Sequence, residues 1–341
     1  MPDAVPAPVT HNEVLKEANP TLASTLAATL ADASLDRFSD DEKEFTKFHG
    51  IYQQDDRDLR KTGKKYIMMV RTRIPGGVMT ANQWVTFDDL ASTYGNNTLR
   101  VTTRQCIQFH GIAKSGLGSV VKKVNECLLS TLAACGDVNR NITASPTPAY
   151  TKARDEVYQH ALRTVGAVAP KTRAYHAIWI DNVQLDLADP ANRDFVDPLY
   201  GKTYLPRKFK IGFVVPPVND MDIFTNDLGF IAIVENDRVV GYNVAVGGGM
   251  GRSHGNEQTF PRLADVIGFI TPEHVNQVAQ AVLTTFRDFG DRTNRKHARF
   301  KYVVEERGVD WTRDEIARRA GVTFAPARPY EFTTTGDLYG W

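Results

Sequence analysis

Residues 99–111 carry the most concentrated polar chemistry in the chain, in the sequence LRVTTRQCIQFHG. The run is rich in β-forming residues and ends in glycine, which predicts one continuous strand. Side chains alternate between the two faces of a strand. One face is then mostly apolar, and the other carries Arg100, Thr102, Arg104, Cys106, Gln108 and His110. This second face has no acid, and arginine binds carboxylates and phosphates through paired hydrogen bonds. The pattern therefore indicates a wall for a polyanionic ligand, with a solvated edge or a basic binding surface as the alternative.

Basic residues recur in four further segments, although the chain as a whole is nearly neutral. They are Arg71 with Arg73, Arg140, Arg207 with Lys208 and Lys210, and the run from Arg292 to Arg299. With 41 basic and 40 acidic residues, the bases are concentrated and not merely abundant. Two lysines on one strand face repel each other unless an anion or water screens them, although lysines can also protect an edge strand. The run from Arg292 would form one stripe of a helix. A ligand with many carboxylates, together with a small anion, would account for all five segments.

Composition narrows the class of protein. The 341 residues are 42% hydrophobic and 24% charged, as is typical of a soluble globular chain. No apolar run approaches the ~20 residues of a membrane span, and the first residues do not look like a signal peptide. The three cysteines, Cys106, Cys127 and Cys135, form no C-x-x-C pair and predict a reducing cytoplasm without a disulfide framework. No nucleophile and base, and no pair of carboxylates, stand out, so the chemistry would belong to a cofactor.

The periodicity predicts an α+β fold with two parts. Strand, helix, strand and helix at residues 66–74, 82–94, 99–111 and 118–134 are typical of half a ferredoxin-like unit. Residues 1–40 are expected to form a loosely packed or wrapping tail with a possible helix at 21–31, and 47–58 an ordered loop. The second part is predicted to contain helices at 151–165 and 271–290, strands at 175–181 and 204–215, a hairpin at 230–246, and a short helix from a capping box at Thr312 to Gly321. Exposed amides of Gly247, Gly248 and Gly249 could cradle an anion.

Six motifs in this sequence resemble those of the sirohaem-dependent nitrite and sulfite reductases, most closely the assimilatory sulfite reductase haemoproteins. In chain order they are Phe48-His49-Gly50-x-Tyr52-x-Gln54-Asp55-Asp56-Arg57-Asp58, Arg71-x-Arg73-x-Pro75-Gly76-Gly77, Leu99-Arg100-x-Thr102-x-Arg104-Gln105-x-x-Gln108-x-His110-Gly111, Asn139-Arg140-Asn141, Tyr204-Leu205-Pro206-Arg207-Lys208-Phe209-Lys210 and Val246-Gly247-Gly248-Gly249. Their order matches that of the family and covers residues 45–341.

The resemblance implies four regions and two sets of site residues. The regions are an extension at 1–64, a ferredoxin-like half-domain at 65–133, a mixed α/β sirohaem-binding domain at 134–329 and the start of a second ferredoxin-like repeat at 330–341. The residues expected to bind sulfite and serve catalysis are Arg71, Arg140, Lys208 and Lys210. The residues expected to hold sirohaem are Arg100, Thr102, Arg104, Gln108, His110, Asn139, Arg207, Gly247, Gly248, Gly249 and Arg299.

The activity implied by the resemblance is six-electron reduction of sulfite to sulfide at sirohaem, fed by a [4Fe–4S] cluster. In the family the four cysteine ligands of the cluster lie in a C-terminal half that this chain does not contain, so this chain alone is expected to be inactive and to hold no metal. An NADPH-dependent flavoprotein subunit or ferredoxin would supply electrons, in the cytoplasm and without nucleic-acid or membrane partners. Assimilatory nitrite reduction is one alternative, and a non-catalytic module that binds sirohaem or nucleic acid is another.

Overall fold

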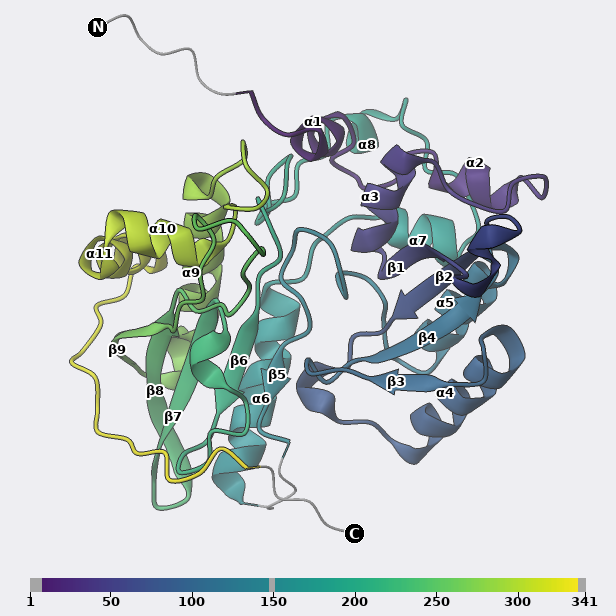
Figure 1. Ribbon diagram of the computed structural model, residues 1–341. Coiled ribbons are helices and arrows are strands. Elements are labelled where there is room, and N and C mark those ends of the chain that lie inside the picture. Colours follow the sequence, from purple (N-terminus) through teal and green to yellow (C-terminus); the bar gives the residue numbers. More distant parts are fainter. Residues whose placement is uncertain (1–7, 147–150, 337–341) are drawn as a thin grey trace, which may run out of the picture.

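A computed structural model describes residues 8–146 and 151–336, which fold around two β-sheets that lie side by side (Figure 1). The four-stranded sheet has the order β1-β2-β4-β3, and the five-stranded sheet has the order β5-β6-β7-β8-β9. The α+β fold class predicted from the sequence is confirmed. In the part of the chain that the structure describes, no helix has both the length and the apolar character needed to cross a membrane.

The N-terminal segment was expected to be a loosely packed or wrapping tail, and its described residues are packed into the body instead of lying loosely on it. It contains α1 (His11–Ala18), α2 (Leu26–Ala31) and α3 (Asp40–Phe48). The helix expected at 21–31 therefore starts five residues later, and α1 was not predicted. Leu22 and Leu26 are fully buried in the core, and the Lys114 ammonium donates to the carbonyl of Asp32 just after α2. A segment that buries apolar side chains in this way contributes to folding of the whole chain.

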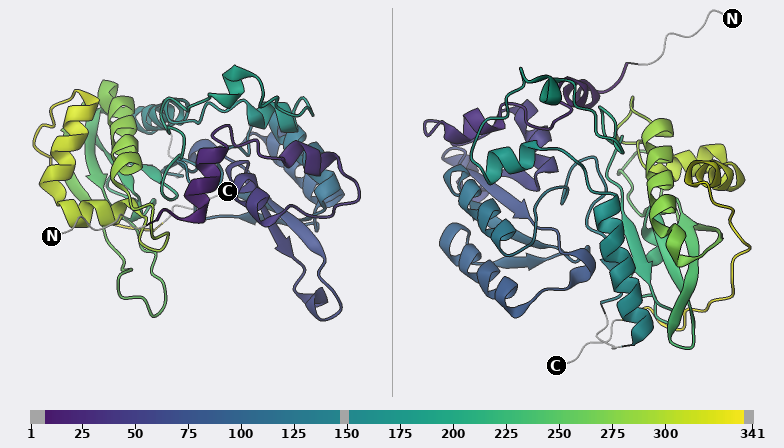
Figure 2. Two further views of the ribbon diagram at one scale, coloured as in Figure 1. Left: turned by 90° about the horizontal axis from the view of Figure 1, so that it is seen from above. Right: turned by 180° about the vertical axis from the view of Figure 1, so that it is seen from behind.

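The four-stranded sheet is antiparallel and consists of β1 (Ile51–Asp55), β2 (Tyr66–Arg71), β4 (Ile107–Ile112) and β3 (Leu99–Val101). The loop expected at 47–58 therefore contains a strand at its centre, and β1 forms an edge of this sheet. Helices α4 (Ala81–Tyr94) and α5 (Leu117–Glu126) cover one face, where the Phe87 and Phe109 rings meet edge to face at 5.1 Å (Figure 2). The second helix ends eight residues earlier than expected. The opposite face of the sheet is not covered by these two helices.

The single strand expected at 99–111 is wrong, because the chain turns back between β3 and β4. The Thr102 hydroxyl accepts from the amide of Cys106 at 3.2 Å, and Gln105 takes a left-handed φ of 52°. A threonine side chain that bonds to the main chain in this way competes with a sheet ladder. As a consequence Arg100 pairs with Gln108 across a hairpin, and Val101 is 70% exposed.

The five-stranded sheet is mixed. Its strands are β5 (Thr143–Ala144), β6 (Ile211–Val214), β7 (Leu228–Glu235), β8 (Arg238–Val246) and β9 (Asp265–Ile270). The first three are parallel, and β7, β8 and β9 are antiparallel. The predicted hairpin is confirmed, and its turn uses Asn236 and Asp237 with positive φ. The helices of this part are α6 (Lys152–Ala167), α8 (Pro190–Arg193), α9 (Val275–Phe289), α10 (Phe300–Arg307) and α11 (Val309–Ala320).

Three further expectations for this part are corrected. Residues 175–181 are not a strand, because residues 175–179 belong to α7 (Ala174–Trp179), whose side chains are mostly buried in the core, and Ile180 ends this helix. Residues 204–210 are irregular, and β6 begins only at Ile211. Residues 292–299 form turns and no helix, because Arg292, Arg295 and Arg299 each bond to an acid on a different segment.

The last helix and the C-terminal residues differ only in part from expectation. Helix α11 starts at Val309, before the proposed capping box, and ends before the left-handed Gly321 as expected. Residues 337–341 of the proposed second repeat lie outside the described residues. Within 330–336, Thr334 forms a single bridge with Val218.

Candidate anion-binding site

A cavity of about 170 Å³ opens where the two parts of the fold meet. Its lining comes from the end of β2, the turn between β3 and β4, the segment around residue 140, and the segment before β6. The lining residues are Arg71, Thr102, Thr103, Arg104, Cys106, Ala134, Arg140, Asn141, Lys208 and Lys210. Five of these ten residues are basic, and none is acidic. Segments that are far apart in sequence thus bring together the four residues expected to bind sulfite.

The two lysines of the cavity have unusual acid–base properties. Burial, together with the nearby Arg299 and other cations, lowers the pKa of both Lys208 and Lys210 from 10.5 to about 8. Among the described residues neither ammonium forms an ion pair, although the main-chain N–H of Lys210 donates to Asp227 at 2.9 Å. Because these two ammonium groups have no counter-ion within the described part of the chain, they are expected to bind an anion. Groups with a pKa near neutrality can also donate protons.

The two arginines of the cavity are held from behind by neutral partners. Arg71 donates to the Cys135 sulfur at 3.1 Å, and Arg140 donates from Nε to the carbonyl of Gly136 at 2.8 Å. The main-chain N–H of Arg140 also donates to the carbonyl of Phe209 at 2.9 Å. Since neutral groups leave the guanidinium charge uncompensated, both arginines add to the positive potential of the cavity.

The open face of the four-stranded sheet continues the basic lining away from the cavity. Strand register places Arg71, Gln108 and Arg100 in one row across β2, β4 and β3, and His110 follows on the same face. When the Gln108 amide is oriented to satisfy both of its atoms, its oxygen accepts from Arg71 and its nitrogen donates to His110. Beside this row a hollow of about 750 Å³ includes Arg100 and His110 in its lining. Burial, and then the charge of Arg100, lowers the pKa of His110, which favours the neutral imidazole at pH 7.

Arg104 lies in the cavity wall, but most of its donors are already used. Its guanidinium donates to the carbonyls of Asn141 and Ile211 at 2.7 and 2.8 Å and to the Asn226 side chain at 2.8 Å. Burial lowers the pKa of this guanidinium to about 10. Arg104 therefore joins the β3–β4 turn to the five-stranded sheet. Thr102 likewise uses its hydroxyl within the turn.

The glycine run after β8 is packed against protein and does not present a cradle of free amides. The amides of Gly247, Gly248 and Gly249 donate to the carbonyls of Asp227, Asn226 and Arg262. A Cβ at Gly248 would lie 2.2 Å from the carbonyl oxygen of Phe224, and one at Gly249 would lie 3.2 Å from the Arg299 guanidinium. The expectation that these amides bind an anion is therefore wrong. The glycines instead allow the loop to approach Arg299 closely.

Three other expected site residues are not part of the cavity lining. Arg299 bonds to Asp227 at 3.0 Å and retains a buried Nε without a partner. The side-chain amide of Asn139 is buried, and neither its nitrogen nor its oxygen has a partner. Arg207 does not line the cavity, and burial and then Arg295 lower its pKa. Sequence reasoning missed the acids Asp137 and Asp227, because a single acid in a loop gives no signal of the buried ion pair it will form.

Comparisons with known proteins identify the family to which this chain belongs. The model for the "Nitrite/Sulfite reductase ferredoxin-like half domain" matches residues 60–127, and the model for the "Nitrite and sulphite reductase 4Fe-4S domain" matches residues 160–324. The chain belongs to the nitrite and sulphite reductase family. The NADPH sulfite reductase haemoprotein beta-component of Myxococcus xanthus is 48% identical over 98% of this chain and 60% of its own length. That of Geobacillus kaustophilus is 46% identical over the whole of this chain and 60% of its own. The chain thus spans about 60% of the length of such relatives.

Solved structures show the same fold at low sequence identity. The NirA protein of Mycobacterium tuberculosis superposes with a TM-score of 0.72 at 20% identity, over 95% of this chain and 55% of that one. A dissimilatory sulfite reductase I superposes with a TM-score of 0.54 at 10% identity, over 82% of this chain and 74% of that one. The family model that matches residues 60–127 confirms the ferredoxin-like half-domain expected from the sequence.

The family depends on sirohaem and a 4Fe–4S cluster, and the two groups fit the described residues differently. For sirohaem, the anion cavity is basic and acid-free, and the hollow beside it has Arg57, Arg60, Lys65 and Arg100 in its lining together with Asp55 and Asp56. The buried Asn139 amide and the Arg299 Nε also lack partners among the residues described, and such unpaired donors fit a ligand with several carboxylates. For the cluster, no group of three or more cysteine, histidine, aspartate or glutamate side chains is placed to hold a metal ion in residues 8–146 and 151–336. Burial raises the pKa of the Cys106 thiol to about 11, which opposes the thiolate that iron requires.

Proposed function

We propose that this chain supplies the anion-binding and sirohaem-binding part of an assimilatory sulfite reductase haemoprotein. The observation that carries the proposal is the acid-free cavity in which Arg71, Arg140, Lys208 and Lys210 meet. Sulfite is a dianion when fully ionised, and four fixed cations in a partly desolvated cavity would bind it strongly. The relatives' names, which specify an NADPH sulfite reductase haemoprotein, point to the same substrate.

Sirohaem is proposed to lie along the open face of the four-stranded sheet, where it would supply the iron chemistry. Arg100, Gln108 and His110 share this face. Arg299 pairs with Asp227 just before β7 and Asn139 bridges Phe209 just before β6, and we propose that both, together with Arg207, contribute to the same ligand site. Thr102, Arg104 and the glycine run would shape the surrounding wall, since their polar groups already have partners. Electrons would come from a flavoprotein subunit that uses NADPH, or from ferredoxin, in the cytoplasm.

The residues of the cavity would perform two tasks during reduction. The guanidiniums of Arg71 and Arg140 would hold the oxygens of the anion through paired hydrogen bonds. Lys208 and Lys210, with pKa values of about 8, would donate protons from Nζ as oxygen leaves as water.

The test measures the chain after expression with sirohaem synthesis active. We expect a sirohaem Soret band in the purified chain, and we expect R100M to weaken it while V85M, a substitution of an exposed residue on α4, does not. Sulfite and nitrite are then titrated by calorimetry, with tighter binding of sulfite expected because it can carry two charges. Tighter binding of nitrite would instead support an assimilatory nitrite reductase. Absence of the band, together with salt-sensitive retention on heparin, would contradict the proposal and favour a nucleic-acid-binding module.

A further inference from the structure

The two lysines of the cavity lie on a segment with little regular structure. Residues 204–210 belong to no strand, and within the described residues their one ladder contact is a bridge between Phe209 and Asn139. A segment without a continuous ladder is free to shift unless other bonds hold it. The positions of Lys208 and Lys210 therefore depend on what holds the two ends of this segment.

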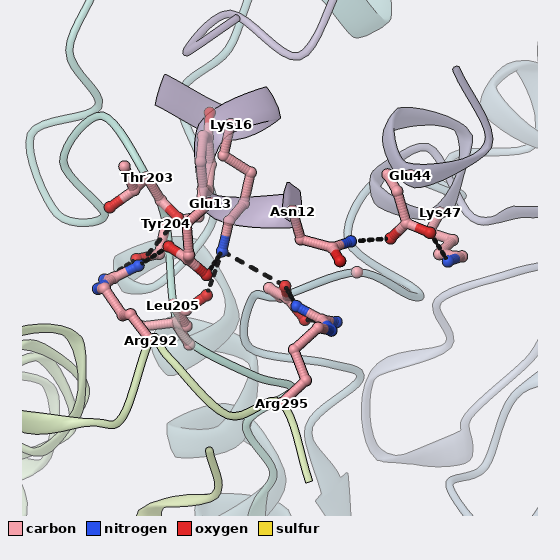
Figure 3. A network of polar contacts seen from close by, with 12 residues as sticks. Asn12, Glu13, Lys16, Glu44, Lys47, Thr203, Tyr204, Leu205, Arg292 and Arg295 are labelled. Atoms are coloured by element: carbon pink, nitrogen blue, oxygen red, sulfur yellow. Dashed lines mark hydrogen bonds and ion pairs between the residues drawn. The ribbon is translucent and has the colours of Figure 1, made fainter. Parts of the chain in front are cut away.

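The first end is held by a buried ionic network that includes the N-terminal helix α1 (Figure 3). Lys16 is 2% exposed, and its ammonium donates to the carbonyl of Leu205 at 2.9 Å and bonds to Glu13. Arg292 bonds to Glu13 as well and donates to the carbonyl of Tyr204 at 2.7 Å. Two cations thus donate hydrogen bonds to two consecutive carbonyls at the start of the segment.

The same network also holds the loop that carries Arg140. Asp137 is 3.4 Å from the Lys16 ammonium and bonds to Arg295 at 2.7 and 3.1 Å. Burial alone would raise the pKa of Asp137, but Lys16 and Arg295 outweigh it and keep the carboxyl ionised. The carbonyl of Asp137 accepts from the amide of Leu205 at 3.0 Å. Lys16 is therefore bonded to both segments that carry cations into the cavity, the one with Arg140 and the one with Lys208 and Lys210.

The second end is held by a separate ion pair. Asp227 is fully buried, bonds to Arg299 at 3.0 Å and accepts from the main-chain N–H of Lys210 at 2.9 Å. With one end anchored here, any relaxation around Leu205 changes the position of Lys208 relative to Lys210 and Arg140.

We propose that Lys16 is a positioning residue for the anion cavity, acting through Asp137 and the main chain of Leu205. The inference rests on the proposed anion-binding function. It assigns to α1 a part in setting the spacing of Arg140, Lys208 and Lys210. Helix α1 thus belongs to the substrate site even though it contributes no residue to the cavity lining.

The substitution K16M tests this role with little damage elsewhere. Methionine keeps most of the aliphatic stem, Glu13 keeps Arg292, and Asp137 keeps Arg295, so no buried carboxylate loses its last cation. The matched control is K114M, because Lys114 is also buried and donates to main-chain carbonyls, at the end of α2 and away from the cavity. K16R keeps a cation at the site and should restore part of the function.

The primary measurement is calorimetric titration of the full chain with sulfite at pH 7, beside thermal unfolding. We expect K16M to raise the dissociation constant about tenfold, K114M to leave it within a factor of two while lowering the unfolding temperature comparably, and K16R to recover most of the affinity. Lys208 owes its low pKa to burial and then to Arg299, Lys210, Arg140 and Arg207. Lys210 owes its low pKa to burial and then to Arg104, Arg299 and Arg140, opposed by Asp227. If the segment relaxes outward in K16M, the pH at which affinity is lost should also move upward.

The outcomes separate this inference from the proposed function. If the unmodified chain binds no sulfite, the proposed function fails, and the inference fails with it. If the unmodified chain binds sulfite and K16M binds it with the same affinity as the unmodified chain, Lys16 is a structural residue only and the inference alone is overturned. Equal losses of affinity in both variants would also overturn it, since general destabilisation would then explain the effect.

Discussion

Alkaline pH should release the anion from the cavity, because two of its cations lose their charge well below the usual lysine range. Burial and neighbouring cations set the pKa of Lys208 and of Lys210 to about 8. Each is then about nine-tenths charged at pH 7 and about one-tenth charged at pH 9. Both are charged together in about 80% of molecules at pH 7 and in about 1% at pH 9, so affinity should fall by up to about 80-fold.

Calorimetric titration with sulfate is the cleanest assay of this loss. Sulfate remains a dianion between pH 6 and 10, whereas sulfite itself gains charge near neutrality. The double variant K208R/K210R keeps both charges and removes the titration, so its affinity should stay nearly constant up to pH 10. An unchanged affinity of the original chain between pH 7 and 10 would refute the reasoning, as would an equal fall in the double variant.

The sign for folding stability is opposite to the sign for binding. Each lysine has a folded-state pKa of about 8, below the ordinary 10.5, so the unfolded chain binds more protons between these values. These two groups therefore make the ligand-free chain more stable as pH rises from 8 to 10.5, while its affinity for the anion falls. Urea unfolding of the original chain and of K208R/K210R over this range would separate the two effects.

Three further substitutions test the packing that supports the site. In the core, His49 accepts from Trp179 at Nδ1 and contacts the Leu22 carbonyl through Nε2, and burial lowers its pKa from 6.5 to about 4. Its contribution to stability is full above pH 6.5, so unfolding free energy should fall by about 2 kcal/mol from pH 7.5 to 5, and H49F should lose this dependence while costing stability at pH 7.5. R104M should lower the unfolding free energy by about 3 kcal/mol even without any cofactor, because it leaves buried carbonyls without donors; an unchanged urea midpoint would contradict this role. G248A should cost about 2 kcal/mol or more, because its Cβ would meet the Phe224 carbonyl at 2.2 Å, whereas G251A, with no atom within 4 Å, should stay within about 0.5 kcal/mol; equal midpoints would show that the loop adapts.

The sequence by itself determined the residue types of the site and the family. The family motifs pointed to Arg71, Arg140, Lys208 and Lys210 as the proposed anion-binding residues, and the absence of acids from the polar face of residues 99–111 indicated a polyanionic ligand. Helices with strong periodicity or clear end signals, such as α4, α6 and α9, were predicted within a few residues. These features are local, so a short window of sequence contains the physical information that sets them.

Only the tertiary structure decided which polar groups remain free to bind a ligand. Arg104 was expected to bind the cofactor, but the carbonyls of Asn141 and Ile211 and the Asn226 side chain occupy its donors. The amides of the glycine run are likewise used within the protein. The hairpin at Thr102 replaced a strand because one hydroxyl bonded to the main chain in place of a ladder. Lys16 gave no signal at all, since its partners Asp137 and Leu205 lie more than 120 residues away. Hydrogen-bond capacity is shared among segments that meet only after folding, and for that reason the sequence could not assign it.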